Sequence, residues 1–216
     1  MEALQKALEA RSKKVNKVET TKALKDPMDV YKKLEEIAAA GYDSLAKEDS
    51  AYFLKCFGLF DKGEDFMLRV RVPVGQLSNE QALCIGNVAQ KYANDYIDIS
   101  TRMQAVLRYI KIENIAKVLQ ELKKAGLTTF QTAADNTRNT VADPLDGLAY
   151  DSIIETKSIV DKMEKQFIEN PEWISTLPRK FNVGILGSLS NSCNIFGHDC
   201  CFVLAQKETF YDSSSH

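Results

Sequence analysis

Arginine side chains recur with strand spacing near the middle of the sequence. From Asp65 to Pro73 apolar and other residues alternate, so Arg69 and Arg71 point to one side of an extended chain, while Phe66 and Leu68 point to the other. Residues i and i+2 on one strand face stand roughly 6.6 Å apart, which lets two guanidinium groups reach neighbouring carboxylates or a small oxyanion. The segment therefore predicts a strand with a cationic front and an anionic partner.

Further basic residues lie in three later segments. Ser100-Thr101-Arg102 precedes a predicted strand that carries Arg108, and Arg138 lies in the turn-rich loop Asp135-Asn136-Thr137-Arg138-Asn139. After Leu177-Pro178-Arg179, Lys180 and Asn182 share one face of an alternating segment. If these segments meet in one fold, their basic side chains form one cationic surface.

The composition restricts the classes of partner. The chain has 216 residues and a formal net charge of -2 at pH 7, so no overall positive field would recruit nucleic acid or an anionic membrane. No run of residues is long and apolar enough to span a bilayer. The segment from Met1 to Val15 is charged and lacks the apolar core of a secretion signal, which predicts a cytoplasmic protein.

The cysteines predict neither a disulfide framework nor a metal site. Five cysteines at irregular spacing are an odd number, which does not suit a set of paired disulfides. Cys193, Cys200 and Cys201 have no fourth ligand nearby, and the adjacent pair is geometrically awkward for a tetrahedral ion. We therefore expect no metal ligands among the residues of this chain.

The pattern of apolar residues predicts an α+β fold. A polar helix over residues 1–25 and a helix over 26–41 come first, followed by a connector over 43–62. The order is then strand, helix, strand, strand, helix, strand, as in a ferredoxin-like βαββαβ unit whose helices cover one face of an antiparallel sheet. The ranges predicted for these six elements are 65–73, 78–92, 96–102, 104–111, 113–125 and 127–131. We expect Phe66, Leu68, Ile97 and Ile99 to face the helices and the arginines to share the open face.

The last third of the chain predicts part of a mixed α/β domain. A loop over residues 135–148 leads to a helix over 152–169, a strand over 180–185 and a final strand over 200–205. We therefore expect three regions, namely an N-terminal helical segment, a ferredoxin-like half-domain and an incomplete α/β domain, over residues 1–50, 51–134 and 135–216.

Four motifs together resemble the siroheme-dependent nitrite and sulfite reductases. They occur in the family's order and at about its spacing, and they read DFMLRVRVP from Asp65, DISTR from Asp98, DNTRN from Asp135 and LPRKFN from Leu177. The resemblance implies a ferredoxin-like unit followed by a siroheme-binding α/β domain. It also implies six-electron reduction of nitrite or sulfite on a siroheme coupled to a [4Fe-4S] cluster, with electrons from ferredoxin or a flavoprotein. Siroheme bears many carboxylates, which suits a face that is rich in arginine.

The resemblance also implies roles for individual residues. Arg69, Arg138 and Lys180 match basic residues that hold the substrate anion, and Asn182 matches a position that is asparagine in many nitrite reductases and lysine in most sulfite reductases. An added ammonium group favours a doubly charged anion over singly charged nitrite, so Asn182 indicates nitrite. The residues that the resemblance assigns to the cofactor are Arg71, Ser100, Thr101, Arg102, Arg108 and Asn139.

This sequence departs from the family's pattern in two respects. Met103 and Gln104 follow Arg102 where the family usually has Gln and Asn, and Val106 stands where a polar cofactor contact is common. The cysteines that bind the cluster belong to the second half of the family's sequence, and four correctly spaced thiolates are needed. The chain therefore resembles the N-terminal half of an enzyme. The alternatives are a fragment of a sulfite reductase hemoprotein and a non-catalytic half-protein that binds a tetrapyrrole or another protein.

Overall fold

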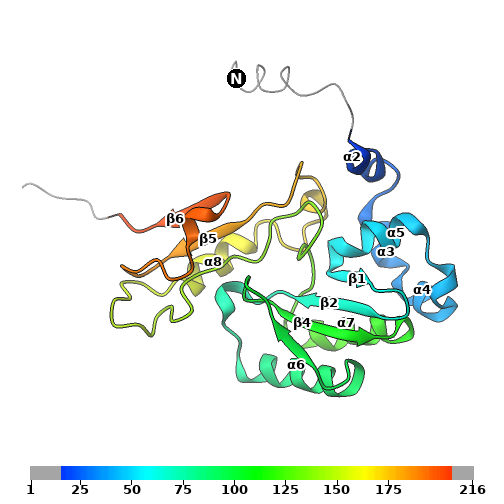
Figure 1. The fold of residues 1–216 in the computed structure, drawn as a ribbon, viewed down its shortest axis with the longest axis horizontal. Helices are drawn as coiled ribbons and strands as arrows, with labels where there is room; N and C mark the ends of the chain where they lie inside the picture. Colours follow the sequence, from blue (N-terminus) through cyan, green and yellow to red (C-terminus); the bar gives the residue numbers. More distant parts are fainter. Residues whose placement is uncertain (1–15, 206–216) are drawn as a thin grey trace, which may run out of the picture.

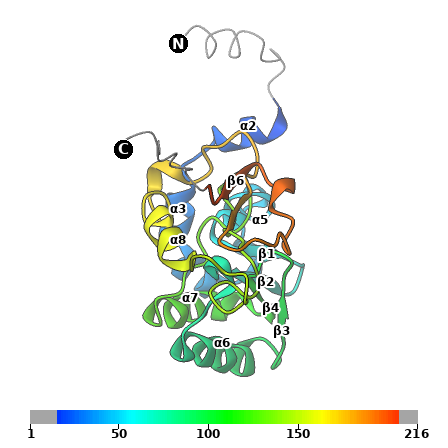
Figure 2. The same cartoon turned by 90° about the vertical axis from the view of Figure 1, so that its left-hand side faces the viewer.

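The centre of the fold is a four-stranded antiparallel sheet, shown in a computed structural model that describes residues 16–205 (Figure 1). The strand order is β1-β2-β4-β3, with β1 at Leu59–Asp61, β2 at Phe66–Val70, β3 at Ile97–Ile99 and β4 at Ala105–Ile110. Helices α6 (Asn79–Tyr92) and α7 (Ile115–Lys124) lie along the same side of the sheet in both views (Figure 1, Figure 2). The predicted α+β fold class is therefore confirmed.

Both covering helices form where the sequence predicts them. The side chain of Ser78 accepts a hydrogen bond from the backbone of Gln81, whose own side chain accepts one from the backbone of Ser78, so α6 begins with a capping box. Along α7 the buried residues recur at helical spacing, and they are Ile115, Val118, Leu119 and Leu122. This apolar stripe packs in the same cluster as Leu68 and Leu107, which are fully buried. Burial of one leucine contributes about 1.5–3 kcal/mol, so the sheet is firmly fixed on its helices.

The strand register decides which side chains face away from the helices. Arg69 pairs with Val106, which pairs with Asp98 on the next strand, so these three residues share the uncovered side of the sheet. Arg108 follows Val106 by two residues, and its Nε donates a hydrogen bond to Asp98 Oδ2 at 2.5 Å. The predicted open face therefore carries Arg69 and Arg108.

The isoleucines of β3 face the helices as expected. Ile97 pairs with Leu107 and Ile99 with Ala105, so both point to the helix side of the sheet. They are nevertheless 39% and 75% exposed, because β3 is an edge strand. The helices therefore leave these two side chains largely uncovered.

The strand predicted over residues 127–131 is not present, and β1 takes the fourth place in the sheet. Two isolated backbone bonds join this segment to its neighbours, from the N–H of Arg71 to the carbonyl of Thr128 at 2.8 Å and from the N–H of Gln131 to the carbonyl of Cys56 at 2.6 Å. The chain then turns, because the Thr128 hydroxyl accepts a bond from the backbone of Phe130 and Gln131 has a positive φ of 57°. The pattern of apolar residues did not reveal these local hydrogen bonds.

Short helices precede the sheet. The structure divides the predicted helix over 26–41 into two, and the 1–15 part of the predicted first helix lies outside the described residues. The predicted connector contains further helical turns and β1. The helical elements are α2 (Lys17–Lys22), α3 (Pro27–Lys32), α4 (Leu34–Ala40), η1 (Tyr42–Ser44), α5 (Lys47–Ala51) and η2 (Phe53–Phe57).

A smaller unit follows the sheet and lies at the other end of the molecule from α4 (Figure 1). It contains α8 (Lys157–Glu164) and the parallel strands β5 (Val183–Leu186) and β6 (Cys200–Val203). Its apolar cluster is small and consists of Val74, Ala142, Val160 and Ile185. The remaining short helices are η3 (Pro73–Gly75), η4 (Ile112–Asn114), η5 (Pro171–Trp173) and η6 (Ile195–Gly197). None of the helices within residues 16–205 has the length and apolar character needed to cross a membrane.

Candidate anion-binding site

Arg69 is a half-buried cation on the open side of β2. Its guanidinium carbon lies 4.5 Å from the centre of the Phe60 ring, which holds the side chain in place. Burial and then the charges of Arg102 and Arg108 lower the pKa of Arg69. The chain beside it is tightly packed, because a Cβ at Gly58, where φ is 80°, would stand 2.7 Å from the Arg69 carbonyl. These arginines therefore lie close enough to repel one another, and an anion between them would relieve the repulsion.

Arg102 projects from the tight turn between β3 and β4. The Ser100 hydroxyl accepts bonds from the backbone N–H groups of Arg102 at 3.3 Å and of Gln104 at 3.2 Å, so it shapes the turn. The side chain of buried Asn139 donates to the carbonyls of Val72 and Arg102, both at 2.8 Å. Ser100 and Asn139 thus position Arg102, whose Nε is buried and has no hydrogen-bond partner among the described residues.

Arg138 is held by the loop that carries it. Its two terminal nitrogens donate to the carbonyls of Thr132 at 2.6 Å and Ala134 at 2.7 Å, and its buried Nε has no partner in the described part of the chain. Burial, followed by the charges of Arg102 and Arg69, lowers the pKa of Arg138 to about 10. Arg138 stays charged at neutral pH, and three arginines from separate segments contribute to one positive field.

Lys22 of α2 connects two loops of the site. Its Nζ lies 3.0 Å from the Asp135 carboxylate, three residues before Arg138, and donates to the Leu177 carbonyl at 2.7 Å, three residues before Lys180. Lys22 is only 12% exposed at its side chain. The N-terminal helical segment therefore supports the loops that present the basic residues.

Lys180 and Asn182 lie at the start of β5. Lys180 is exposed, whereas Asn182 is half-buried and donates from its backbone N–H and its side-chain Nδ2 to Asp199 Oδ2, at 2.8 and 2.9 Å. These hydrogen bonds and the nearby charge of Lys180 lower the pKa of Asp199. No local pattern in the sequence indicates this contact, because Asp199 lies 17 positions away, directly before β6.

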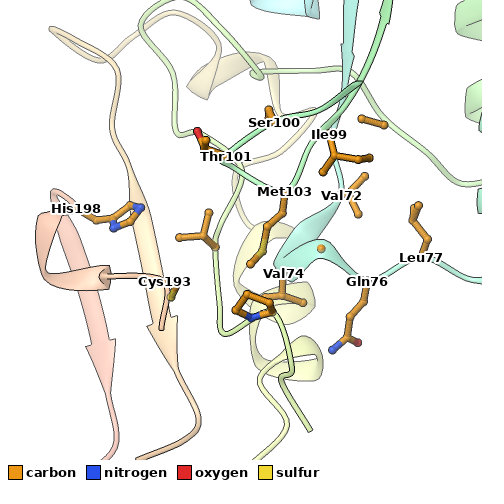
Figure 3. Close-up of a pocket in the computed structure, with 14 residues that line it drawn as sticks. Val72, Val74, Gln76, Leu77, Ile99, Ser100, Thr101, Met103, Cys193 and His198 are labelled. Atoms are coloured by element: carbon orange, nitrogen blue, oxygen red, sulfur yellow. The ribbon is translucent and has the colours of Figure 1, made fainter. Parts of the chain in front are cut away.

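Two adjoining cavities lie between the Arg102 turn and the loop before β6. The polar cavity, of about 290 Å³, is lined by Thr101, Arg102, Asn182 and His198 among others. The more apolar cavity, of about 440 Å³, shares Thr101 and His198 with it and extends past Met103 (Figure 3). A cationic pocket beside an apolar slot suits a ligand that is flat, apolar in its body and acidic at its rim.

Arg71 has different partners from those that the sequence suggested. Its side chain is fully buried, and Nε and one terminal nitrogen donate to the two carboxylate oxygens of Glu164 on α8, each at 3.0 Å. Further bonds go to the carbonyls of Thr137 at 3.2 Å and Arg138 at 2.8 Å. The hydrogen bonds of the guanidinium thus connect the segment directly after β2 with the Arg138 loop and with α8. We therefore leave Arg71 out of the ligand-binding set, and Glu164 is the partner that sequence reasoning missed.

The structure brings together most of the sequence-predicted residues. The charges of Arg69, Arg102 and Arg138 act on one another, and Thr101, Arg102 and Asn182 line one cavity. Ser100 and Asn139 act on the backbone, and Arg108 is paired with Asp98. Fold and geometry together define an α+β protein with a cationic sheet face, in which the Arg102 turn and a second unit line a polar cavity.

Two family profiles match this chain in succession. The profile described as "Nitrite/Sulfite reductase ferredoxin-like half domain" matches residues 61–125, and "Nitrite and sulphite reductase 4Fe-4S domain" matches residues 133–210. The chain belongs to the nitrite and sulfite reductase family, as its motifs predicted.

Individual relatives agree with this assignment. The chain is 35% identical to a ferredoxin–nitrite reductase of Leptolyngbya laminosa over 90% of its own length and 39% of the relative's. It is 28% identical to a ferredoxin sulfite reductase of Mycobacterium tuberculosis over 80% of its length and 35% of the relative's. The solved structure of the M. tuberculosis NirA protein matches with a TM-score of 0.81 and 27% identity, over 91% of this chain and 39% of that one. The chain thus spans about two-fifths of the length of these relatives.

Proposed function

We propose that this chain is the N-terminal part of a siroheme- and [4Fe-4S]-dependent nitrite reductase that reduces nitrite to ammonia. Family membership and the names of the relatives support the reaction class. The observation that carries the proposal is the mutual approach of Arg69, Arg102 and Arg138 from three separate segments, because such a concentration of positive charge is unfavourable without an anion.

The residues of the site fit an acidic macrocycle. Arg102 and Arg138 each have a buried Nε without a partner in residues 16–205, and Arg102 lines the polar cavity beside the apolar slot. Carboxylates at the rim of siroheme would accept bonds from such groups, with Thr101 beside them and Ser100 and Asn139 fixing the turn. When bound, siroheme and its coupled cluster would transfer electrons from the external donor to the substrate.

The residues of this chain supply charge and protons. Arg69, Arg138 and Lys180 lower the free energy of an anion and of the negative charge that develops on its oxygens. Lys180 is exposed and can exchange protons with water, so its Nζ can deliver a proton. Arg108 strengthens the field near Arg69, although its charge is offset by Asp98.

We further propose ferredoxin as the electron donor and the cytoplasm as the location. The donor follows from the names of the relatives, which include chloroplastic proteins as well. A flavoprotein is the alternative donor. We also propose a boundary near residue 134 between the ferredoxin-like half-domain and the siroheme-binding domain, which the two successive family matches, to residues 61–125 and 133–210, support.

Cofactor binding is tested on the full chain. Produced with siroheme supply and purified, the unmodified chain should carry the visible spectrum of the tetrapyrrole, and Arg102→Gln should lower the bound fraction severalfold. Lys117→Gln removes one positive charge from the exposed side of α7 and should leave the fraction unchanged. A chain that never carries the cofactor, with intact secondary structure by circular dichroism, would reject siroheme binding by this part alone.

Substrate choice is tested on the protein that includes the rest of the family's sequence. Nitrite and sulfite are assayed side by side, with Asn182→Lys as the variant. We expect nitrite reduction to dominate in the unmodified protein and sulfite reduction to gain in the variant. Dominant formation of sulfide by the unmodified protein would favour the alternative, a sulfite reductase.

A further inference from the structure

Asp199 contacts the residue that the sequence associates with substrate choice. Its Oδ2 accepts hydrogen bonds from both the backbone N–H and the side-chain Nδ2 of Asn182. The pairing of β6 with β5 holds this arrangement, because the backbone N–H of Cys200 donates to the Asn182 carbonyl at 3.1 Å. The amide of Asn182 is therefore fixed by the residue that directly precedes β6 before any ligand binds.

The contact has two consequences for an anion in the polar cavity. One of the two N–H groups of the Asn182 amide donates to Asp199, so the amide is held in one orientation and that N–H is not offered to a bound anion. The other end, Oδ1, is buried without a partner in the described chain and cannot donate. Residue 182 thus offers at most one side-chain N–H to an anion, although it lines the cavity with Arg102.

The carboxylate also subtracts charge from the site. Asp199 interacts electrostatically with Lys180, which belongs to the proposed anion-binding set. A negative charge at the edge of the site repels a dianion twice as strongly as a monoanion at the same position, because the Coulomb energy is proportional to the charge of each partner.

We propose that Asp199 is a positioning and specificity-determining residue of this site. It fixes the orientation of the Asn182 amide, engages one of its two N–H donors and weakens the binding of dianions relative to monoanions. The inference rests on the proposed function, since it assumes that the cavity binds the substrate anion. It also implies that a lysine at position 182 would meet the Asp199 carboxylate, so that Asn182→Lys alone recovers less dianion affinity than Asn182→Lys combined with Asp199→Asn.

The test uses nitrate, a monoanion, and sulfate, a dianion, as ligands that are not themselves reduced. Each anion is titrated into the full chain at low ionic strength, and its affinity is measured by calorimetry. Asp199→Asn keeps an oxygen that can accept the bonds of Asn182 but removes the charge. We expect nitrate affinity to rise about twofold and sulfate affinity about fourfold, the square of the nitrate factor. Asp43→Asn, at an exposed carboxylate in η1, is the matched control and should change neither affinity. Equal factors for the two anions, or no change, would overturn the specificity role.

A second readout separates this proposal from the proposed function. In the unmodified chain the side-chain NH₂ signals of Asn182 in a ¹⁵N-correlated NMR spectrum should differ from those in Asp199→Ala, and Asp43→Asn should leave them in place. If neither anion binds to the unmodified chain, the anion site is wrong and the specificity role falls with it. Even in that case, the Asn182 NH₂ signals test whether Asp199 positions the amide. If Asp199→Ala leaves these signals unchanged, the positioning role of Asp199 is overturned.

Discussion

Replacement of Glu164 by alanine should destabilise the whole junction between the sheet and the smaller unit. Glu164 accepts two bonds from the fully buried Arg71, and its Oε1 also accepts a bond from the hydroxyl of Thr140 at 2.9 Å. The variant removes all of these acceptors at once. The guanidinium of Arg71 would keep only its bonds to the carbonyls of Thr137 and Arg138.

The expected cost follows from the burial of the pair. The side chains are 0% exposed for Arg71 and 7% for Glu164, so water cannot replace the missing carboxylate. Breaking a buried ion pair by removal of one partner costs about 3–5 kcal/mol, because an uncompensated charge is left in the interior. Domains of ordinary stability unfold with about 5–15 kcal/mol, so Glu164→Ala should consume a large part of the total.

Urea denaturation followed by circular dichroism measures this free energy. Asp161→Ala is the matched control, because Asp161 lies on the same helix and forms a partly exposed (i, i+4) pair with Lys157, worth about 0.3–0.5 kcal/mol. Arg71→Met tests the same junction by removing the charge that needs compensation. The double variant Arg71→Met with Glu164→Ala should therefore lose less free energy of unfolding than the sum of the losses of the two single variants. A loss below about 1 kcal/mol for Glu164→Ala would refute the assignment of Arg71 to a structural role.

Two further predictions follow from single groups. Lys22→Met should lower the free energy of unfolding by about 1 kcal/mol and weaken nitrate binding in calorimetry, because Lys22 bonds to both site loops; unchanged binding would contradict its supporting role. Burial raises the pKa of Cys56 to about 12, so iodoacetamide at neutral pH should modify Cys200 well before Cys56, as peptide mass spectrometry would show; equal rates would contradict the buried position.

Local patterns in the sequence predicted most of the elements that position the site. The capping box at Ser78 and the helical stripe ending at Leu122 are signals within a few residues, and both helices occur where expected. The prediction of a strand over residues 127–131 was wrong, because the same residues can adopt either an extended or a turn conformation. The hydroxyl of Thr128 and the positive φ of Gln131 favour the turn, and the short strand β1 was available to pair with β2. Different segments compete to pair with the same strand, and the alternation of apolar residues alone does not predict which of them pairs.

Arg69 and Arg71 show the same limit at the site itself. Alternation predicts both arginines on one side of an extended chain, but β2 ends at Val70 and the backbone N–H of Arg71 donates to the Thr128 carbonyl instead of to a neighbouring strand. Arg71 lies beyond the end of the strand, and its side chain is buried in the interior, where it donates to Glu164 of α8. No feature near Arg71 in the sequence indicates a carboxylate 93 positions away. A basic residue can therefore be predicted from its spacing to lie on a face, but whether it is available to a ligand depends on which acidic residues the rest of the fold brings to it.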